Sequence, residues 1–206
     1  MAKVISFLLL LAVGGAAIIW FTQTKDLPQT LDSPNKLHSS TTTWRKYVAP
    51  KGQFSVLLPS LPHHATDMVN EPITHEVRQY EMFLAKKDDG TVYSINLISF
   101  PAKKTIKEEE KDLEKLVNEL LSSNPNNKVK NVLKSQFREN KAIDFSVEAD
   151  QMSMSGKAFL KDSTLYVLST SAAKTNNSNT QEFNFFINSF QLAPGAHTQT
   201  DALDAK

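Results

Sequence analysis

The feature that most constrains this chain is an apolar run near its beginning. Residues 4–21, VISFLLLLAVGGAAIIWF, contain no charged side chain and follow Lys3. A helix of this length spans about 27 Å, close to the hydrocarbon thickness of a bilayer, and satisfies its own backbone hydrogen bonds. Trp20 and Phe21 suit the membrane interface, and Lys3 suits the cytoplasmic side. Residues 1–21 are therefore predicted to form a single-pass membrane anchor, with the remainder of the chain exported.

A cleaved signal peptide is the alternative interpretation of this segment. Its hydrophobic region would run from Val4 to Leu11, and Gly15 and Ala17 are small enough for the positions before a cleavage site. Cleavage there would leave the apolar residues 18–21 exposed, so we favour an uncleaved anchor. Both interpretations place the rest of the chain outside the cytoplasm, either tethered to the inner (cytoplasmic) membrane on its periplasmic side or secreted.

Composition limits what the exported part can do. The chain has 23 Lys and Arg against 22 Asp and Glu, and leaving out Lys3 makes 22 of each sign. This balance gives no electrostatic attraction for nucleic acid, so no nucleic-acid partner is expected. The absence of cysteine excludes disulfides, thiolate metal sites, thiol nucleophiles and lipid attachment to cysteine. An exported domain of about 150 residues that folds without disulfides favours a bacterial protein.

Local composition divides the remainder into three parts. Residues 22–43 are polar, rich in Thr and Ser and interrupted by two prolines, which predicts a flexible stalk. Residues 44–192 carry regular apolar patterns and are expected to form one folded domain. Residues 193–206 are polar after Pro194 and Gly195 and are expected to be a disordered tail.

Alternating apolar residues predict eight strands within the domain. The predicted strands are 44–48, 54–58, 73–85, 91–100, 129–139, 142–149, 152–160 and 164–171. The apolar phase slips within 73–85, which predicts a bulge near residues 79–81. Apolar residues on both sides of 164–171 predict a central strand that is covered on both faces. Met152 and Met154 share one face, for which we favour a core position over an adaptable partner surface.

Helical spacing of apolar residues predicts two helices. The first begins with capping-box spacing at Thr105 and Glu108, and its stripe contains Ile106, Leu113, Leu116, Val117, Leu120 and Leu121. The second covers residues 179–190 after Ser178, which has capping-box spacing to Gln181. Its stripe of three phenylalanines is expected to pack in the core rather than hold a cofactor. The order ββββ-α-ββββ-α predicts an α+β domain, in which an antiparallel sheet is covered by two amphipathic helices.

No catalytic set stands out in the sequence. His63 and His64 are adjacent, and neighbouring side chains of an extended chain point apart, so they are poorly placed to chelate one metal and are expected to be loop histidines in water. There is no G-x-S-x-G motif and no Gly-rich phosphate loop. We therefore predict no catalytic, cofactor-binding or metal-binding residue and no cofactor, and we do not expect an enzyme.

Two stretches carry a family resemblance. They are Trp44 with Pro50-Lys-Gly-x-Phe-Ser-Val-x-Leu-Pro-x-x-Pro62, and Phe186-Ile-x-Ser-Phe-x-Leu192. Together they resemble the PsbP-like fold family, which includes the photosystem II extrinsic protein and many small exported bacterial domains. The likeness covers residues 44–192 and implies a PsbP-like α/β/α sandwich. It also implies an accessory or docking role without a shared active site.

We expect a non-enzymatic, membrane-tethered extracytoplasmic accessory domain that docks a protein or an envelope component. Its expected partners are the membrane, through residues 4–21, and a protein. The alternative is a small-molecule or lipid-binding domain with a pocket between sheet and helix. An exposed apolar patch over a solid core would favour docking, and an apolar cavity of several hundred Å³ would favour ligand binding.

Overall fold

The computed structural model of the chain describes residues 41–70, 77–101, 110–175 and 179–193. The predicted anchor, all but the end of the predicted stalk and residues 194–206 lie outside these ranges. The last stalk residues, Thr41–Thr43, form a short 3-10 helix, η1. Within the described ranges, no helix combines the length and the hydropathy that a membrane span requires.

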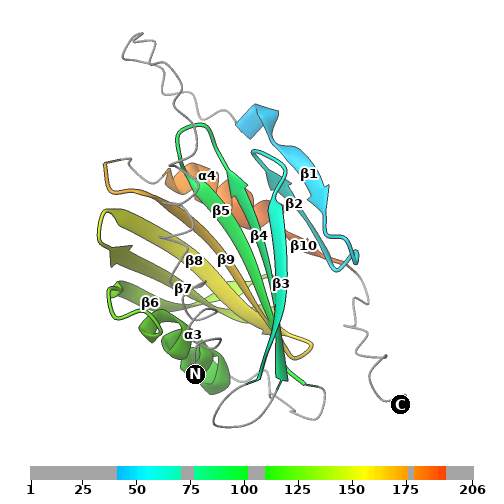
Figure 1. Ribbon diagram of the computed structural model, residues 1–206, viewed down its shortest axis with the longest axis vertical. Helices are drawn as coiled ribbons and strands as arrows, with labels where there is room; N and C mark the ends of the chain where they lie inside the picture. Colours follow the sequence, from blue (N-terminus) through cyan, green and yellow to red (C-terminus); the bar gives the residue numbers. More distant parts are fainter. Residues whose placement is uncertain (1–40, 71–76, 102–109, 176–178, 194–206) are drawn as a thin grey trace.

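The described residues form two antiparallel sheets (Figure 1). The large sheet has seven strands in the order β3-β4-β5-β9-β8-β7-β6. Its strands are β3 (His63–Asn70), β4 (Val77–Lys86), β5 (Val92–Ser99), β6 (Lys128–Phe137), β7 (Asn140–Ala149), β8 (Met152–Lys161) and β9 (Thr164–Ala173). The small sheet has the order β1-β2-β10. Its strands are β1 (Arg45–Val48), β2 (Phe54–Leu58) and β10 (Gln191–Leu192).

The helices lie on opposite faces of the large sheet. α3 (Glu110–Ser122) packs on β7 and β8, whereas α4 (Thr180–Ser189) packs on β9 and on β2 of the small sheet. Two hydrophobic clusters result, one on each face. In β9, Leu165 and Val167 belong to the α3 side, and Tyr166 and Leu168 belong to the α4 side. The prediction that this strand is central and covered on both faces is therefore confirmed.

The predicted sheet covered by two helices is wrong. The domain is mostly β, because strands hold 57% of the described residues and only two α-helices occur among them. α3 covers one face of the large sheet, but the other face is shared between α4 and the whole small sheet. The prediction failed because alternation identifies strands without showing which ones pair. β1 pairs with β2, and β2 pairs in turn with β10, which follows α4, so both strands belong to the small sheet instead of the large one.

Two further details of the large sheet differ from the sequence predictions. No strand was predicted at 63–70, where β3 lies. The bulge predicted near residues 79–81 is absent, since β4 pairs with β5 in unbroken register from Gln79 to Lys86. Apolar residues of both phases occur in β4 because both of its faces are partly covered: Phe83 faces the small sheet, and Tyr80 packs on the α3 side.

Both predicted helical stripes reach the core. Leu113, Val117 and Leu121 of α3 are buried, as are Phe186 and Ile187 of α4. The predicted capping residues Thr105, Glu108 and Ser178 lie outside the described residues. The N-cap of α4 is Asn179, whose side-chain oxygen accepts from the backbone N–H groups of Gln181 and Glu182. Of the two methionines predicted in the core, Met154 is partly buried and packs against the α3-side cluster, whereas Met152 is partly buried and belongs to neither cluster.

Candidate functional site

The two edges of the large sheet differ in how they are protected. β6 carries Lys128, Lys130 and Lys134, and its pairing with β7 shifts register between Val129 and Asn131. β3 contains no lysine and pairs with β4 without interruption over its full length. Lysines and bulges are the usual means by which natural sheets block the addition of another strand. In the described part of the chain, β3 is therefore the edge that is open to a further strand.

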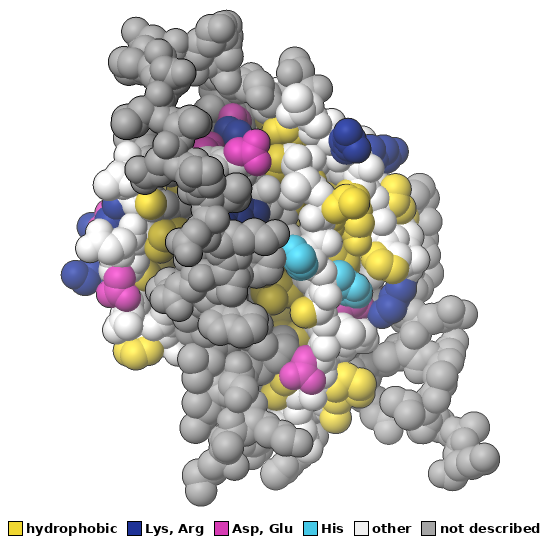
Figure 2. Space-filling model, turned by 45° about the horizontal axis from the view of Figure 1, so that its top comes forward, with side chains coloured by type: hydrophobic (Ala, Val, Ile, Leu, Met, Phe, Trp, Pro, Cys, Tyr) yellow, Lys and Arg dark blue, Asp and Glu magenta, His cyan; other side chains and the backbone are white. Residues whose placement is uncertain are grey.

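The side chains of β3 are exposed along almost all of its length. Seven of its eight residues are exposed, and Met68 is 59% accessible. Leu61, just before the strand, is 83% accessible. Figure 2 shows the two described histidines, in cyan, on a face that also carries hydrophobic side chains. An open backbone edge next to exposed apolar side chains is typical of an interaction surface. We call this surface, Leu61 and residues 63–70, the β3 edge.

A buried carboxylate lies beneath the β3 edge. Glu81 of β4 is 6% exposed, and its Oε1 accepts hydrogen bonds from Lys51 Nζ at 2.8 Å and from Gln79 Nε2 at 3.2 Å. His64 Nε2 lies 3.4 Å from the other oxygen, Oε2. A buried carboxylate is stable only when such partners replace its hydration. Lys51 lies in the turn between β1 and β2, so Glu81 joins the small sheet to β3 and β4.

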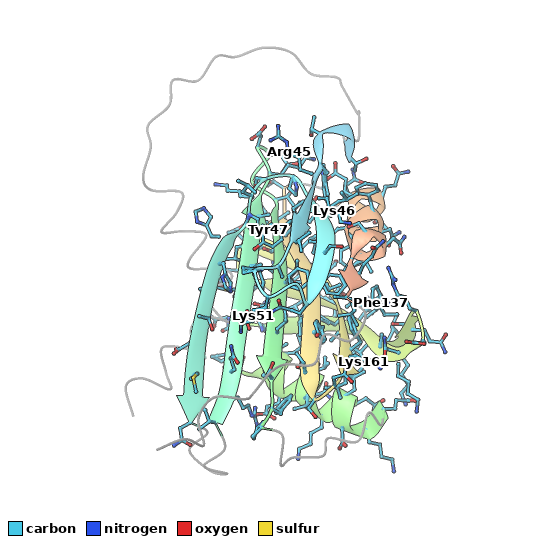
Figure 3. All side chains as sticks on the ribbon, turned by 90° about the vertical axis from the view of Figure 1, so that its right-hand side faces the viewer. Arg45, Lys46, Tyr47, Lys51, Phe137 and Lys161 are labelled. Carbon is cyan, nitrogen blue, oxygen red and sulfur yellow. The ribbon has the colours of Figure 1, made fainter. Side chains whose placement is uncertain are left out.

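Aromatic contacts hold the same junction together. The ring of His64 lies parallel to the buried ring of Phe83, with centroids 4.3 Å apart and 4° between the planes. Tyr47 of β1 approaches Phe83 with a centroid distance of 6.0 Å. Burial and the nearby carboxylate of Glu81 raise the pKa of Tyr47. Tyr47 and Lys51, both labelled in Figure 3, therefore connect the small sheet to the edge of the large one.

The structure corrects the expectation that His63 and His64 are loop residues in water. Both lie in β3, and His64 packs on the core. Among the described residues, no group of three or more His, Asp or Glu side chains is placed to hold a metal ion. Sequence reasoning missed β3 because HHATDMVN shows no apolar alternation. It has only two β-branched residues, Thr66 and Val69, and no Phe, Tyr or Trp. Only its long register against residues 77–84 defines it.

A second candidate site is a cavity of about 310 Å³ between α4 and the large sheet. It is lined by the end of β6, the turn after it, β7, β8 and one side of α4. The lining residues are Gln136, Phe137, Arg138, Asp144, Lys157, Phe183, Asn184, Ile187 and Asn188. Figure 3 labels Phe137, at the end of β6. Most of these side chains are polar, so the cavity differs from the apolar pocket that lipid binding would require.

The cationic side chains of the cavity are held in place by protein contacts. Lys157 Nζ donates to Ser135 Oγ at 2.8 Å and to the Gln136 carbonyl at 3.3 Å, and it pairs with Asp144 Oδ1 at 2.5 Å. Arg138 Nη2 donates to the carbonyl of Phe190 at 2.8 Å. Contacts with β6 and β7 thus fix the position of Lys157, and the carbonyl of Phe190 fixes that of Arg138.

Comparison with known proteins gives a fold and no family. No protein-family model matches the chain, and no curated protein matches its sequence. Among solved structures, the chain is similar to cyanobacterial PsbP (CyanoP) from Synechocystis sp. PCC 6803, with 13% identity and a TM-score of 0.50. The match covers 79% of this chain and 99% of that one. At this identity the likeness shows the fold alone, and it confirms that the chain has a PsbP-like fold.

Proposed function

We propose that this chain is a membrane-tethered, extracytoplasmic accessory domain that docks another protein along the β3 edge. The observation that carries the proposal is the contrast between the two edges of the large sheet. β6 has the lysines and the register shift that prevent strand addition, and β3 has neither. An extended segment of a partner would add its backbone hydrogen bonds to β3, and its side chains would contact Leu61 and Met68.

The rigid base of the β3 edge supports the same function. A peptide that adds to a sheet binds best when the receiving strand is already in place, because little entropy is lost on binding. β3 is fixed by eight residue pairs with β4, by the stacking of His64 on Phe83 and by the Glu81 contacts. Tethering follows from residues 4–21, whose apolar length predicts an anchor. The accessory role agrees with the PsbP-like fold.

The non-enzymatic part of the proposal is supported by the state of the buried carboxylates. Glu81 is held by Lys51 and Gln79, and Glu182 is held by Lys87 and Tyr93. Each of these carboxylates joins separate elements of the fold, and such a role explains its burial without catalysis. The alternative function, a lipid carrier, is less well supported because the cavity beside α4 has a mostly polar lining.

Site-specific photocrosslinking in the full-length protein tests the docking proposal. A photoreactive residue at Thr66 of β3 should crosslink one discrete partner in intact membranes, whereas the same group at Asn131 of β6 should not. Met68→Lys should abolish the crosslink because it places a lysine on β3, and lysines on an edge strand such as β6 oppose the addition of another strand. Leu133→Lys on β6 is the matched control, since Leu133 is 61% exposed. A crosslink that survives Met68→Lys, or that forms equally well from Asn131, would contradict the proposal.

Protease accessibility tests the tethered topology separately. The domain should be digested once the outer layers of the cell are permeabilised while the inner membrane stays intact. Protection under these conditions would place the domain in the cytoplasm and contradict the proposed location.

A further inference from the structure

We propose that the cavity between α4 and the large sheet is a binding site for a saccharide. The proposal does not depend on docking at the β3 edge. The cavity is lined by residues of β6, β7 and β8, the three strands at the opposite end of the large sheet from β3 (Figure 1). Its volume of about 310 Å³ is at the lower end of the range of small-molecule sites, which suits one or two sugar rings.

Three side-chain amides supply the main hydrogen-bonding groups. Gln136, Asn184 and Asn188 line the cavity, and within the described residues their side chains make no hydrogen bond. Asn184 and Asn188 are one helical turn apart on α4, so both lie on the same side of that helix. A carboxamide both donates and accepts hydrogen bonds, as each sugar hydroxyl does. Neighbouring hydroxyls of a sugar ring can therefore pair with these amides in both directions.

The charged groups of the cavity favour a neutral or weakly anionic ligand. Lys157 neutralises Asp144, with which it forms an ion pair. Asp144 remains 42% exposed, so its carboxylate can also accept from a ligand hydroxyl. Arg138 leaves one uncompensated positive charge among the lining residues. The Asp144 carboxylate would repel a strongly anionic ligand such as a phosphate ester. A sugar hydroxyl would instead donate a hydrogen bond to this carboxylate.

Apolar residues form a further part of the wall. Phe183 and Ile187 of α4 and Phe137 of β6 line the cavity together with the polar groups. A sugar ring has an apolar C–H face as well as its hydroxyls, and aromatic side chains in binding sites pack against such faces. The lining thus matches both kinds of surface that a saccharide presents, whereas a lipid would leave the amides unpaired.

The backbone at Arg138 provides an independent observation. Arg138 has φ of 56°, in the two-residue turn between Phe137 and Asn140. This region favours Gly, Asn or Asp, and the next two hairpin turns have Asp150 and Asp162 there. Residues other than glycine with this conformation occur in tight hairpin turns and also cluster at functional sites. Its guanidinium is held by the Phe190 carbonyl and lies 5.5 Å from the centroid of the Phe137 ring, at the cavity wall.

Titration calorimetry with the full-length protein in detergent tests the site. The probes are N-acetylglucosamine, glucose and glucuronic acid, with inorganic phosphate as the anion control. Saturable binding of at least one saccharide is expected, with a Kd of about 1 mM or tighter. Asn184→Ala combined with Asn188→Ala should weaken it at least tenfold. Asn131→Ala removes an exposed carboxamide of β6 outside the cavity and should leave the Kd unchanged.

Arg138→Gly separates binding from stability. Glycine relieves the positive φ, so the melting temperature should stay the same or rise, while saccharide affinity should fall at least tenfold. Co-sedimentation with insoluble cell-wall glycan tests whether the bound sugar is part of a polymer or free in solution. Either result supports the site if the Asn184 and Asn188 substitutions abolish binding. The proposal is overturned if no saccharide binds up to about 10 mM. It is also overturned if phosphate competes for the site, or if binding survives the double substitution.

Discussion

The ring of Phe190 stacks on the ring of Phe54, with centroids 5.0 Å apart and 26° between the planes. Phe54 begins β2, and Phe190 follows α4 near the end of the domain. Phe190 also meets Phe137, Phe159 and Tyr166 of the large sheet at centroid distances of 6.1, 6.2 and 6.1 Å. One side chain thus joins the small sheet, α4 and the large sheet.

Phe190→Ala should lower the free energy of unfolding by about 3–5 kcal/mol, because it opens a cavity where three parts of the fold meet. Phe190→Leu should lower it less, since leucine fills part of the space. Urea unfolding of both variants measures the difference. Equal losses for Ala and Leu would show that the aromatic contacts, rather than the volume, stabilise this region.

Glu182→Ala should also lower the free energy of unfolding by about 3–5 kcal/mol. The buried Glu182 carboxylate accepts from Lys87 Nζ at 2.8 Å and from the Tyr93 hydroxyl at 2.9 Å. The substitution therefore leaves the buried Tyr93 hydroxyl without this acceptor, and Lys87 keeps only its ion pair with Asp89. Glu139→Ala, in the exposed turn after β6, is the control and should change stability by less than about 0.5 kcal/mol. Equal stabilities of the two variants would show that the contacts of Glu182 with Lys87 and Tyr93 do not hold α4 against β5.

Gly156→Ala should destabilise the protein by about 1–3 kcal/mol. Gly156 of β8 lies opposite Phe145 of β7, and an added Cβ would lie 2.2 Å from Cζ of that ring. The shorter side chain of Phe145→Leu should relieve the clash. A double-mutant cycle by chemical denaturation should therefore show a smaller loss for Gly156→Ala in the Phe145→Leu background. An unchanged loss would place the strain elsewhere.

Stability should fall at high pH because of the buried tyrosines. Burial, with smaller contributions from Asp162 and Glu81, raises the pKa of Tyr166 to about 12. The unfolded value is about 10, so the folded state binds more protons between these values. The stabilisation is complete below about pH 10 and is lost as the pH rises through about 12. Burial and Glu182 also raise the pKa of Tyr93, which acts in the same direction.

Urea unfolding at about pH 9 and about pH 11 measures this loss. Tyr166→Phe keeps the ring that stacks on Phe159, at a centroid distance of 5.0 Å, but removes the titrating hydroxyl. The variant should lose less stability than the wild type over this interval. An identical loss in the two proteins would assign the alkaline effect to other groups.

The parts of the fold that depend on neighbouring residues were predictable from the sequence. The stripe Leu113, Val117 and Leu121 predicted the buried face of α3, since helical spacing alone decides which residues share a side. The two phases of apolar residues in 164–171 predicted a central strand for the same kind of reason. Ser178 and Gln181 pointed to the start of α4, although the described cap is Asn179. Helix ends differ by a residue because several polar side chains can cap the same turn.

The candidate sites were not predictable, because they join residues that are distant in the sequence. Glu81 and His64 carry no local signal, and only the register of β3 on β4 and the position of Lys51 bring them together. The cavity depends on how α4 packs near the end of β6, which brings Asn184 and Arg138 into one cavity lining. Neither periodicity nor turn chemistry reports such a relation.

The sequence by itself determined an apolar segment of membrane-spanning length, a charge-balanced domain without cysteine, and the faces of its main helices and strands. These properties depend on composition and on the repeat of each element, which are local. The tertiary structure decided that β2 pairs with β10, that β3 is the unprotected edge and that a polar cavity lies beside α4. Pairing and packing depend on the burial that distant segments can share, so they are fixed only when the whole domain folds.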